Sequence, residues 1–405
     1  MSILANISGQ TKEVKDIFIN VSGEKKKCTS AWKKENEQIK KVYKTKRNVW
    51  AWIDYHSGSC IAYHFSDKFV YNSQNIIYVF PSGDTTETYD DIRYFHGNFY
   101  VLAKSGNVYK SNNLTDWILL ETVIKDPKNE SIVSSATPRF YRTKSRLFIL
   151  WKVASVTSTA TSVEGQYTRY CLNEDESDFI RFILPGDYLN DDFKSQTVST
   201  AFNTYAVNFF ENEDEDTINF FFIGKNMDTK MQTVTAYTID ANLNSDKRIE
   251  VNESYASYPV AENNLMGWYD NIEKSTYIYM KTATYRLNLL VFPLGSKDFN
   301  KVSITSTPDY NNSSAKVEVA ATNNTVLQIC KLSSSKEWYK SLNNMRTKIL
   351  LSNNTGYLGE FLRAIDDYIF LYHGCNYLNW FVISENKNYM SGYGSMGAID
   401  KGIID

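Results

Sequence analysis

Acidic side chains beside apolar segments are the residues of this sequence with the most evident chemistry. Glycoside hydrolysis needs two carboxylates about 5 to 10 Å apart, one of them held protonated in a partly dry cleft. Eight carboxylates next to predicted strands could supply such a pair: Asp54, Asp84, Asp90, Asp91, Glu164, Glu253, Asp270 and Glu360. No neighbouring sequence singles out any of them. The sequence therefore permits a glycan hydrolase without assigning its catalytic pair.

One segment crowds a nucleophile and a base together. Ser57, Ser59 and Cys60 lie between His56 and His64. A nucleophile and its base are recognised by geometry, which spacing along the chain does not supply. The sequence also lacks a Gly-x-Ser-x-Gly elbow, a phosphate loop and a dinucleotide fingerprint. We therefore expect a core or turn role for this segment, no catalytic residue of this class, and no cofactor.

Metal binding is not predicted. Residues 240–246 alternate oxygen ligands as a calcium loop does, but they lack the Gly at position six and the Glu at position twelve. The five cysteines are scattered without a CxxC spacing, and the four histidines form no ligand pairs with them. The cysteines are expected to be free thiols of a reducing compartment.

Aromatic residues near strand ends are the candidates for ligand binding. Indole and phenol rings combine a large apolar face with a polar edge, which suits them to contact with sugars. Trp52, Tyr55, Trp268 and Tyr269 are the candidates for glycan stacking. Most other aromatic side chains are expected to pack between sheets.

A polar turn at Ser111, Asn113 and Trp117 resembles the S-x-D-L-x-x-W turn, or Asp box, of glycosidase propellers. The resemblance implies that the polar side chains bond backbone amides and that the Trp packs between sheets, so the motif is structural. Asn113 replaces the usual Asp. The alternative is an ordinary Asn-Asn turn followed by a core Trp.

Short apolar segments of strand length dominate the chain and predict an all-β fold. Nine of them are 76–80, 99–102, 147–151, 206–210, 218–223, 277–280, 287–292, 326–329 and 368–372. Turns rich in Asn, Asp, Ser and Gly separate them. The acidic runs 173–178 and 211–216 are predicted to be solvated hairpin loops. The one ambiguous helical candidate is 334–345.

The pattern of predicted strands and turns repeats along the chain. Residues 89–120 contain four apolar segments separated by turns, and weaker copies of this pattern begin near Pro138, Ala315 and Gly359. Division of residues 50–400 into seven units gives about 50 residues each, close to propeller repeats of roughly 40 to 50. We predict a β-propeller of six or seven blades, seven slightly favoured, which begins at 48–54 and has its last core strand near Trp380. Two stacked β-sandwiches are the competing architecture.

Composition excludes several classes of partner. The chain of 405 residues has 44 basic and 46 acidic side chains and a net charge of -2, so no dominant attraction to nucleic acid or anionic membrane is expected. At 15% aromatic residues it is too apolar for disorder. It shows neither a signal peptide nor an apolar run of about 18 residues. We expect a protein made in the cytoplasm of its host cell, without membrane insertion and without need of a charged partner.

Residues 1–47 differ from residues 48–405, because they are rich in lysine and poor in aromatic residues. We predict two domains with this boundary: an N-terminal adaptor, then the propeller. In the adaptor, Ser22 and Gly23 would form the turn between a strand at 17–21 and a strand through 28–32. Because an isolated two-stranded hairpin is marginally stable, the adaptor is expected to dock on a partner.

Residues 16–32 followed by 40–44 resemble a segment, I-x-V-N-V-x-G-x-K-K-x-I-T-S-x-W … K-V-x, that opens many tail, baseplate and fibre proteins of phages and phage-like particles of low-GC Gram-positive bacteria. The resemblance departs at 33–38, where charged residues replace a Gly-containing turn. It implies an adaptor hairpin plugged into a virion or tail-like particle, present in multiple copies, and a variable distal domain.

These observations favour a structural or receptor-binding component of a phage tail or baseplate, anchored to other tail proteins by residues 1–47. Its propeller would present a face to host cell-wall carbohydrate. The alternative is a glycan-degrading hydrolase of the same particle that uses two carboxylates in the propeller. A free cytoplasmic scaffold is the third interpretation, and it would leave residues 1–47 dispensable.

Overall fold

The computed structural model describes most of the chain as β-strands and short turns. The described residues are 4–7, 10–13, 18–21, 24–27, 30–35, 38–44, 46–55, 59–71, 75–123, 138–150, 169–182, 202–226, 231–254, 265–281, 287–293, 300–304, 316–322, 325–331, 336–341, 349–354, 361–372, 378–385, 387–390 and 396–404. Among them there is no helix, and hence none of membrane-spanning length.

Seven four-stranded antiparallel sheets lie in the described part of the chain. The first contains β34 (Met396–Ile404), β7 (Arg47–Asp54), β8 (Cys60–Phe65) and β9 (Ile77–Val79). The next three are β10 (Tyr89–Phe95), β11 (Asn98–Ala103), β12 (Asn107–Ser111) and β13 (Ile118–Thr122); β14 (Arg139–Arg142), β15 (Leu147–Leu150), β16 (Arg169–Leu172) and β17 (Phe179–Phe182); and β18 (Phe202–Asn212), β19 (Thr217–Asn226), β20 (Met231–Ile239) and β21 (Ser245–Ser254). The last three are β22 (Leu265–Asp270), β23 (Ser275–Lys281), β24 (Leu287–Pro293) and β25 (Asn300–Ile304); β26 (Lys316–Thr322), β27 (Thr325–Lys331), β28 (Lys336–Ser341) and β29 (Ile349–Asn354); and β30 (Phe361–Ile365), β31 (Tyr368–Tyr372), β32 (Leu378–Val382) and β33 (Lys387–Met390).

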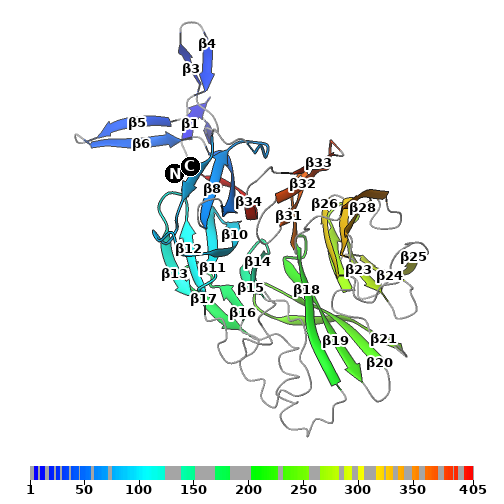
Figure 1. The fold of residues 1–405 in the computed structure, drawn as a ribbon. Helices are drawn as coiled ribbons and strands as arrows, with labels where there is room; N and C mark the ends of the chain where they lie inside the picture. Colours follow the sequence, from blue (N-terminus) through cyan, green and yellow to red (C-terminus); the bar gives the residue numbers. More distant parts are fainter. Residues whose placement is uncertain are drawn as a thin grey trace.

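The sheets are arranged as a β-propeller (Figure 1). The first strands of successive sheets contact one another in the series β34, β10, β14, β18, β22, β26 and β30, and β31 returns to β34. All nine apolar segments named above overlap strands of the described residues, and the repeat at residues 89–120 coincides with β10–β13. The prediction of an all-β propeller is confirmed.

The helical candidate at 334–345 is wrong, because residues 336–341 form strand β28. β28 pairs with β27 on one side and β29 on the other, with Trp338 opposite Ile329. Pairing on both edges overrides the weak 3.6-residue pattern that suggested a helix.

The two ends of the ring meet in one sheet. β34, the last strand of the chain, pairs with β7, so that Ile404 lies opposite Arg47 and Ile399 opposite Trp52. The predicted start of the propeller at 48–54 matches β7, but the predicted last core strand near Trp380 stops short of β34. A first sheet completed by the last strand leaves no open inner edge at the junction.

Aromatic side chains fill the space between sheets. Trp50 and Trp52 of β7 are fully buried, and Trp50 packs edge-on against Phe69 and Tyr368 at 5.5 and 5.3 Å between ring centroids. Phe69 in turn meets Trp380 at 5.2 Å. The first and last sheets therefore share one aromatic core.

One face of the propeller, here called the hairpin face, is formed by the turns that follow the first and third strands of the sheets. Side-chain contacts link these turns from sheet to sheet. His96 Nε2 lies 2.7 Å from the Lys144 carbonyl oxygen, and the backbone amide of Ser145 donates to Asp216 at 3.0 Å. Because Arg47 lies opposite Ile404 at the end of β34, residues 1–46 join the ring at this face.

The first 44 residues contain three two-stranded hairpins: β1 (Leu4–Ile7) with β2 (Gln10–Glu13), β3 (Phe18–Val21) with β4 (Glu24–Lys27), and β5 (Ser30–Glu35) with β6 (Gln38–Lys44). β3 agrees with the predicted strand at 17–21. Its partner is β4, whereas the predicted return strand through 28–32 overlaps β5, which pairs with β6.

Gly402 of β34 lies where the last strand packs against β10 and β11, and its substitution tests that packing. A Cβ atom there would meet the ring of Tyr94 and would lie 2.7 Å from Cε2 of Phe99. We expect Gly402→Ala to lower the free energy of unfolding by about 1–3 kcal/mol, because both rings would have to shift. Urea unfolding measures this, and the adjacent exposed Ile403, changed to Ala, should cost about 0.5 kcal/mol. Equal effects of the two changes would contradict tight packing of β10 and β11 on β34.

Candidate functional site

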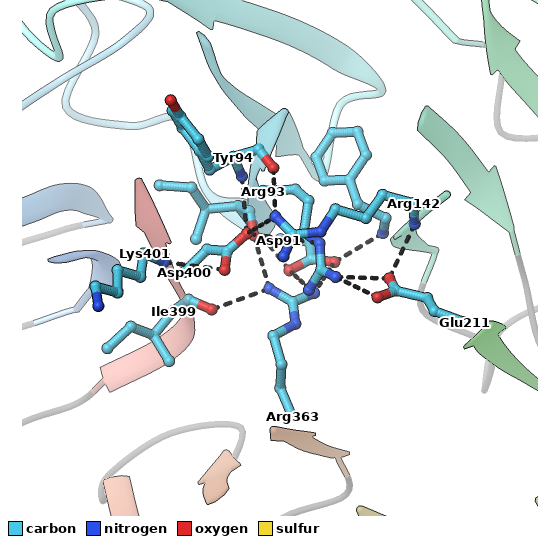
Figure 2. Close-up of polar contacts among 11 residues, drawn as sticks. Asp91, Arg93, Tyr94, Arg142, Glu211, Arg363, Ile399, Asp400 and Lys401 are labelled. Atoms are coloured by element: carbon cyan, nitrogen blue, oxygen red, sulfur yellow. Dashed lines mark hydrogen bonds and ion pairs between the residues drawn. The ribbon is translucent and has the colours of Figure 1, made fainter. Parts of the chain in front are cut away.

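Six charged side chains meet where the first strands of five sheets converge (Figure 2). We call them the axial network. Its members are Asp91 and Arg93 from β10, Arg142 from β14, Glu211 from β18, Arg363 from β30 and Asp400 from β34. Three guanidinium groups therefore face three carboxylates.

Asp91 and Arg363 form its most deeply buried pair. The side chain of Asp91 is 0% exposed and that of Arg363 is 4% exposed. Nη2 of Arg363 donates to both carboxylate oxygens at 3.0 Å, while Nη1 donates to the carbonyl oxygens of Ile92 and Ile399. Asp91 also accepts the backbone amides of Ile92 and Phe140 at 2.8 Å. This pair thus joins β10, β14, β30 and β34, and it satisfies backbone groups at the inner edges of the sheets.

Asp400 lies at the centre of the remaining part of the axial network. Its Oδ2 lies 3.5 Å from Nε of Arg93 and 3.7 Å from Nη1 of Arg142, and it accepts the Tyr94 amide at 2.8 Å. Arg93 reaches on to Glu211 at 2.7 Å, and Glu211 also accepts the backbone amide of Arg142 at 2.9 Å. Arg142 and Glu211 keep about a quarter of their side-chain surface exposed, at 27% and 23%. The network therefore runs from a dry interior to a wet end.

The surrounding arginines favour the charged form of Asp400. Burial by itself favours the neutral acid at Asp400, but Arg93, Arg142 and Arg363 outweigh burial and keep the pKa of Asp400 below its ordinary value. A general acid for glycoside hydrolysis needs the opposite shift, towards a raised pKa. Asp400 is therefore suited to hold the ring together and unsuited to donate a proton.

The predicted catalytic carboxylates are not brought together as one pair. Of the eight, Asp91 belongs to the axial network, Asp54 and Asp270 are buried at the ends of β7 and β22, and Asp90 is buried beside Asp91. Asp270 accepts the backbone amides of Ile272 and Glu273, which is a turn role. Asp84 is exposed and bonds Thr86, which lowers its pKa. Glu253 lies on β21, and Glu164 and Glu360 lie outside the described residues.

Cys60 and His64 occupy core positions on β8. Burial, reinforced by Asp54, raises the pKa of the Cys60 thiol to about 12, so the reactive thiolate is suppressed. Burial lowers the pKa of His64, whose ring packs against Trp52 at 5.6 Å. His56 lies outside the described residues. The core role expected for this segment matches the placement of both described residues.

The turn at 111–117 has the hydrogen bonds that an Asp box would make. Ser111 Oγ accepts the Leu114 amide at 2.9 Å, and Asn113 Oδ1 accepts the amides of Thr115 and Asp116 at 2.9 and 2.8 Å. Trp117 Nε1 donates to the Leu114 carbonyl oxygen at 3.0 Å. All three predicted residues act within the turn, which leaves the motif a structural one.

The four candidates for glycan stacking differ in exposure. Trp52 is 0% and Trp268 is 4% exposed, so neither presents an open ring face. Tyr55 and Tyr269 are half-buried; Tyr55 donates to the Tyr89 carbonyl oxygen and Tyr269 to Asp214. Burial and the bond to Asp214 raise the pKa of Tyr269. Among these four, only Tyr55 and Tyr269 keep surface for a ligand.

The two acidic runs and the calcium-like loop all lie at the hairpin face. Asp240 Oδ1 accepts the amides of Asn242 and Asn244, so this carboxylate caps its own turn. No group of three or more metal-ligating side chains occurs within the described ranges. The run 211–216 is only partly a solvated loop, because Glu211 lies in β18 and bonds the buried Arg93.

Sequence reasoning missed five of the six network residues as a group: Arg93, Arg142, Glu211, Arg363 and Asp400. A signal was present in the strand segments, where a single charge interrupts an apolar run, as in Phe361–Ile365 and 396–400. A charged residue on a buried strand requires a partner. The charged partners are far apart in the sequence, 118 positions for Arg93 with Glu211 and 272 for Arg363 with Asp91, so spacing could not pair them.

No family model and no curated protein sequence matches the chain. Solved structures similar to it include a protein from Lactobacillus plantarum, at 7% identity and a TM-score of 0.49, over 88% of this chain and 100% of that one. YCF48 bound to D1 peptide is similar at 8% identity and a TM-score of 0.43, over 80% of this chain and 85% of that one. A fucose-specific lectin from Aleuria aurantia is similar at 9% identity and a TM-score of 0.40, over 74% and 90%. Similarity at this level does not extend to ligand or activity.

Removal of one partner from the deepest pair should be costly. We expect Arg363→Met to lower the free energy of unfolding by about 3–5 kcal/mol, because the buried Asp91 carboxylate would lose the guanidinium partner that lies 3.0 Å away. The control is Lys401→Met, which breaks an exposed pair with Asp366 and should cost about 1 kcal/mol or less. Urea midpoints compare the two, and similar losses would show that the axial pair is not a buried charge pair in solution.

Acid should weaken the ring through Asp400. Because its pKa is lowered in the folded chain, its contribution is fully present above the unfolded pKa of about 3.9 and is lost as the pH falls through the folded value. We expect Asp400→Asn to lower the free energy of unfolding at pH 7 by about 3 kcal/mol and to flatten the loss below about pH 4. Urea unfolding at pH 2.5 to 7 measures both, with exposed Glu213→Gln as the control. An unchanged pH slope in Asp400→Asn would contradict the assignment.

Proposed function

We propose that this chain is a structural or receptor-binding component of a phage tail, baseplate or tail-like particle, made in the host cytoplasm and carried in multiple copies. Residues 1–47 attach it to other tail proteins, and residues 48–405 form a propeller that binds host cell-surface glycan. The resemblance of residues 16–44 to adaptor segments of such proteins supports this proposal.

The observation that carries the proposal is the state of the first 44 residues. Each of β1–β6 hydrogen-bonds to its hairpin partner alone within the described residues, and no hairpin adds to a propeller sheet. Two-stranded hairpins are marginal on their own in water. Three of them in succession are what an attachment module awaiting a partner would contain.

A binding role is favoured over the alternative, hydrolysis by two carboxylates. The carboxylates at the convergence of the sheets are paired with arginines, and the pKa of Asp400 is lowered. Loss of turbidity or release of reducing sugar from host cell walls, abolished by a single Asp or Glu to Ala change in one pocket, would favour the hydrolase instead.

We further propose that the seven described sheets are the seven blades of one closed ring. The series of contacts from β34 through β30, with the return from β31 to β34, supports this number. A closed ring exposes fewer unpaired strand edges, which suits strands rich in Tyr and Phe.

Lysine-reactive cross-linking of intact particles tests the attachment directly. Residues 24–44 hold eight lysines, and we expect cross-links from Lys26, Lys34 and Lys41 to another tail protein. The exposed Lys68 and Lys104 of the propeller serve as internal controls and should give few such links. Recovery of the chain only outside particles, with no foreign peptide linked to residues 24–44, would reject the proposal.

A further inference from the structure

The whole chain is nearly neutral, but its positive and negative charges are unevenly distributed along the sequence. Residues 1–47 contain 12 Lys and Arg against five Asp and Glu, a net charge of +7. Since the total is -2, residues 48–405 carry -9. Opposite charges on two parts of one molecule steer copies of that molecule towards each other.

The positive charge is concentrated on three strands. Lys25, Lys26 and Lys27 lie on β4, two lysines lie on β5 and three on β6. In the register of β5 and β6, Lys33 lies directly opposite Lys40. Like charges directly opposite each other destabilise a strand pair, and a two-stranded sheet has little stability to lose. An acidic surface in contact with the β5–β6 hairpin would relieve this repulsion.

The negative charge gathers at two turns of the hairpin face. Residues 173–178 and 211–216 contain nine carboxylates and no Lys or Arg. Apart from Glu174, three of the nine have cationic partners elsewhere: Glu211 pairs with Arg93, Asp214 with Lys274 and Glu176 with Lys110. Glu174 is 84% exposed on its side chain even though it pairs with Arg146, and Glu213 is exposed as well. The two turns lie on one face, since Glu176 contacts His96, whose ring reaches Lys144, and Ser145 bonds Asp216.

The lysine-bearing hairpins do not cover these turns of their own chain. Figure 1 shows β3–β6 projecting from the ring beside β8, away from β16–β19. Both features nevertheless belong to the hairpin face, because β7 leaves that face at Arg47, opposite Ile404. Two chains that meet hairpin face to hairpin face can therefore exchange the same contact in both directions, which is the condition for a closed two-fold interface.

We propose that the lysine-bearing strands β4–β6 of one chain dock on the acidic turns 173–178 and 211–216 of a second copy, which gives a dimer with two reciprocal contacts. This goes beyond the attachment proposed above, because it concerns contacts between copies and needs no other tail protein. β1 and β3 carry no lysine and remain available for the particle.

Charge reversal on the full chain tests the proposal. One variant carries Lys33→Glu and Lys40→Glu, and a second carries Glu174→Lys and Glu213→Lys. Each should weaken dimerisation about tenfold or more at low salt, measured by sedimentation, because like charges then face each other. The matched control, Lys68→Glu with Lys104→Glu, reverses two exposed lysines outside the hairpins and should leave the dimer unchanged.

The decisive measurement is the chain with all four reversals, which exchanges the signs and should dimerise again. An equimolar mixture of the two double variants should form heterodimers for the same reason. Wild-type association should also weaken as salt rises from about 0.05 to 0.5 M, since the Debye length shrinks.

Three results would overturn the dimer. The first is a wild-type chain that is monomeric at low salt, and the second is a dimer whose stability changes neither with salt nor with either pair of reversals. The third is a chain with all four reversals that stays monomeric although it has the wild-type melting temperature. A monomeric chain whose lysines cross-link to another acidic protein in particles would leave the attachment standing and reject the second copy as the occupant.

Discussion

The pairing of β34 with β7 is the constraint on which the rest of the propeller depends. It brings the last strand of the chain into the first sheet and delivers Asp400 to the convergence of the sheets. Without β34, Arg93, Arg142 and Arg363 would lose the carboxylate that lies among them, and three buried or half-buried cations would remain against two anions. Backbone pairing and buried charge are therefore not independent stabilising elements. Each one holds the other in place, and a fold closed in this manner should open cooperatively rather than sheet by sheet.

The same closure restricts where function can lie. A propeller often leaves its centre for a ligand, but here the described inner strands direct charged side chains at one another in a balanced set of three guanidiniums and three carboxylates. Asp91 and Arg363 are almost entirely buried, whereas Arg142 and Glu211 keep about a quarter of their side-chain surface exposed. The charged side chains at the axis are thus engaged with one another. The acidic turns at the hairpin face differ, since Glu174 and Glu213 are exposed to solvent.

Local sequence patterns were enough to predict the fold, but they could not predict which distant residues pair. Alternation and apolar bursts gave the strands correctly, and the repeat at 89–120 marked one complete sheet, because both depend on neighbours a few residues apart. Strand β34 was missed because its partner β7 is more than 340 positions away. The ambiguous helical candidate at 334–345 was wrong because strand pairing decides the structure of so short a segment. Trp52 and Trp268 were placed in the ligand group since a Trp near a strand end looks the same whether it faces solvent or a neighbouring sheet. The network residues could be recognised singly as charges in apolar strands, but their pairing needs the closed ring.

Net charge was the least informative quantity and charge distribution the most. A total of -2 suggested that the chain needs no charged partner, yet the same total arises from +7 on residues 1–47 and -9 on the remainder. At about 0.15 M salt, charges further apart than about 8 Å are largely screened, so a distant domain of opposite sign cannot neutralise the hairpins. A surface of opposite charge therefore lowers the repulsion among these lysines only where it lies in contact with them. In the register of β5 and β6, Lys33 lies opposite Lys40. Like charges at facing positions lower the stability of a two-stranded sheet, so an oppositely charged surface in contact with such a hairpin would raise that stability.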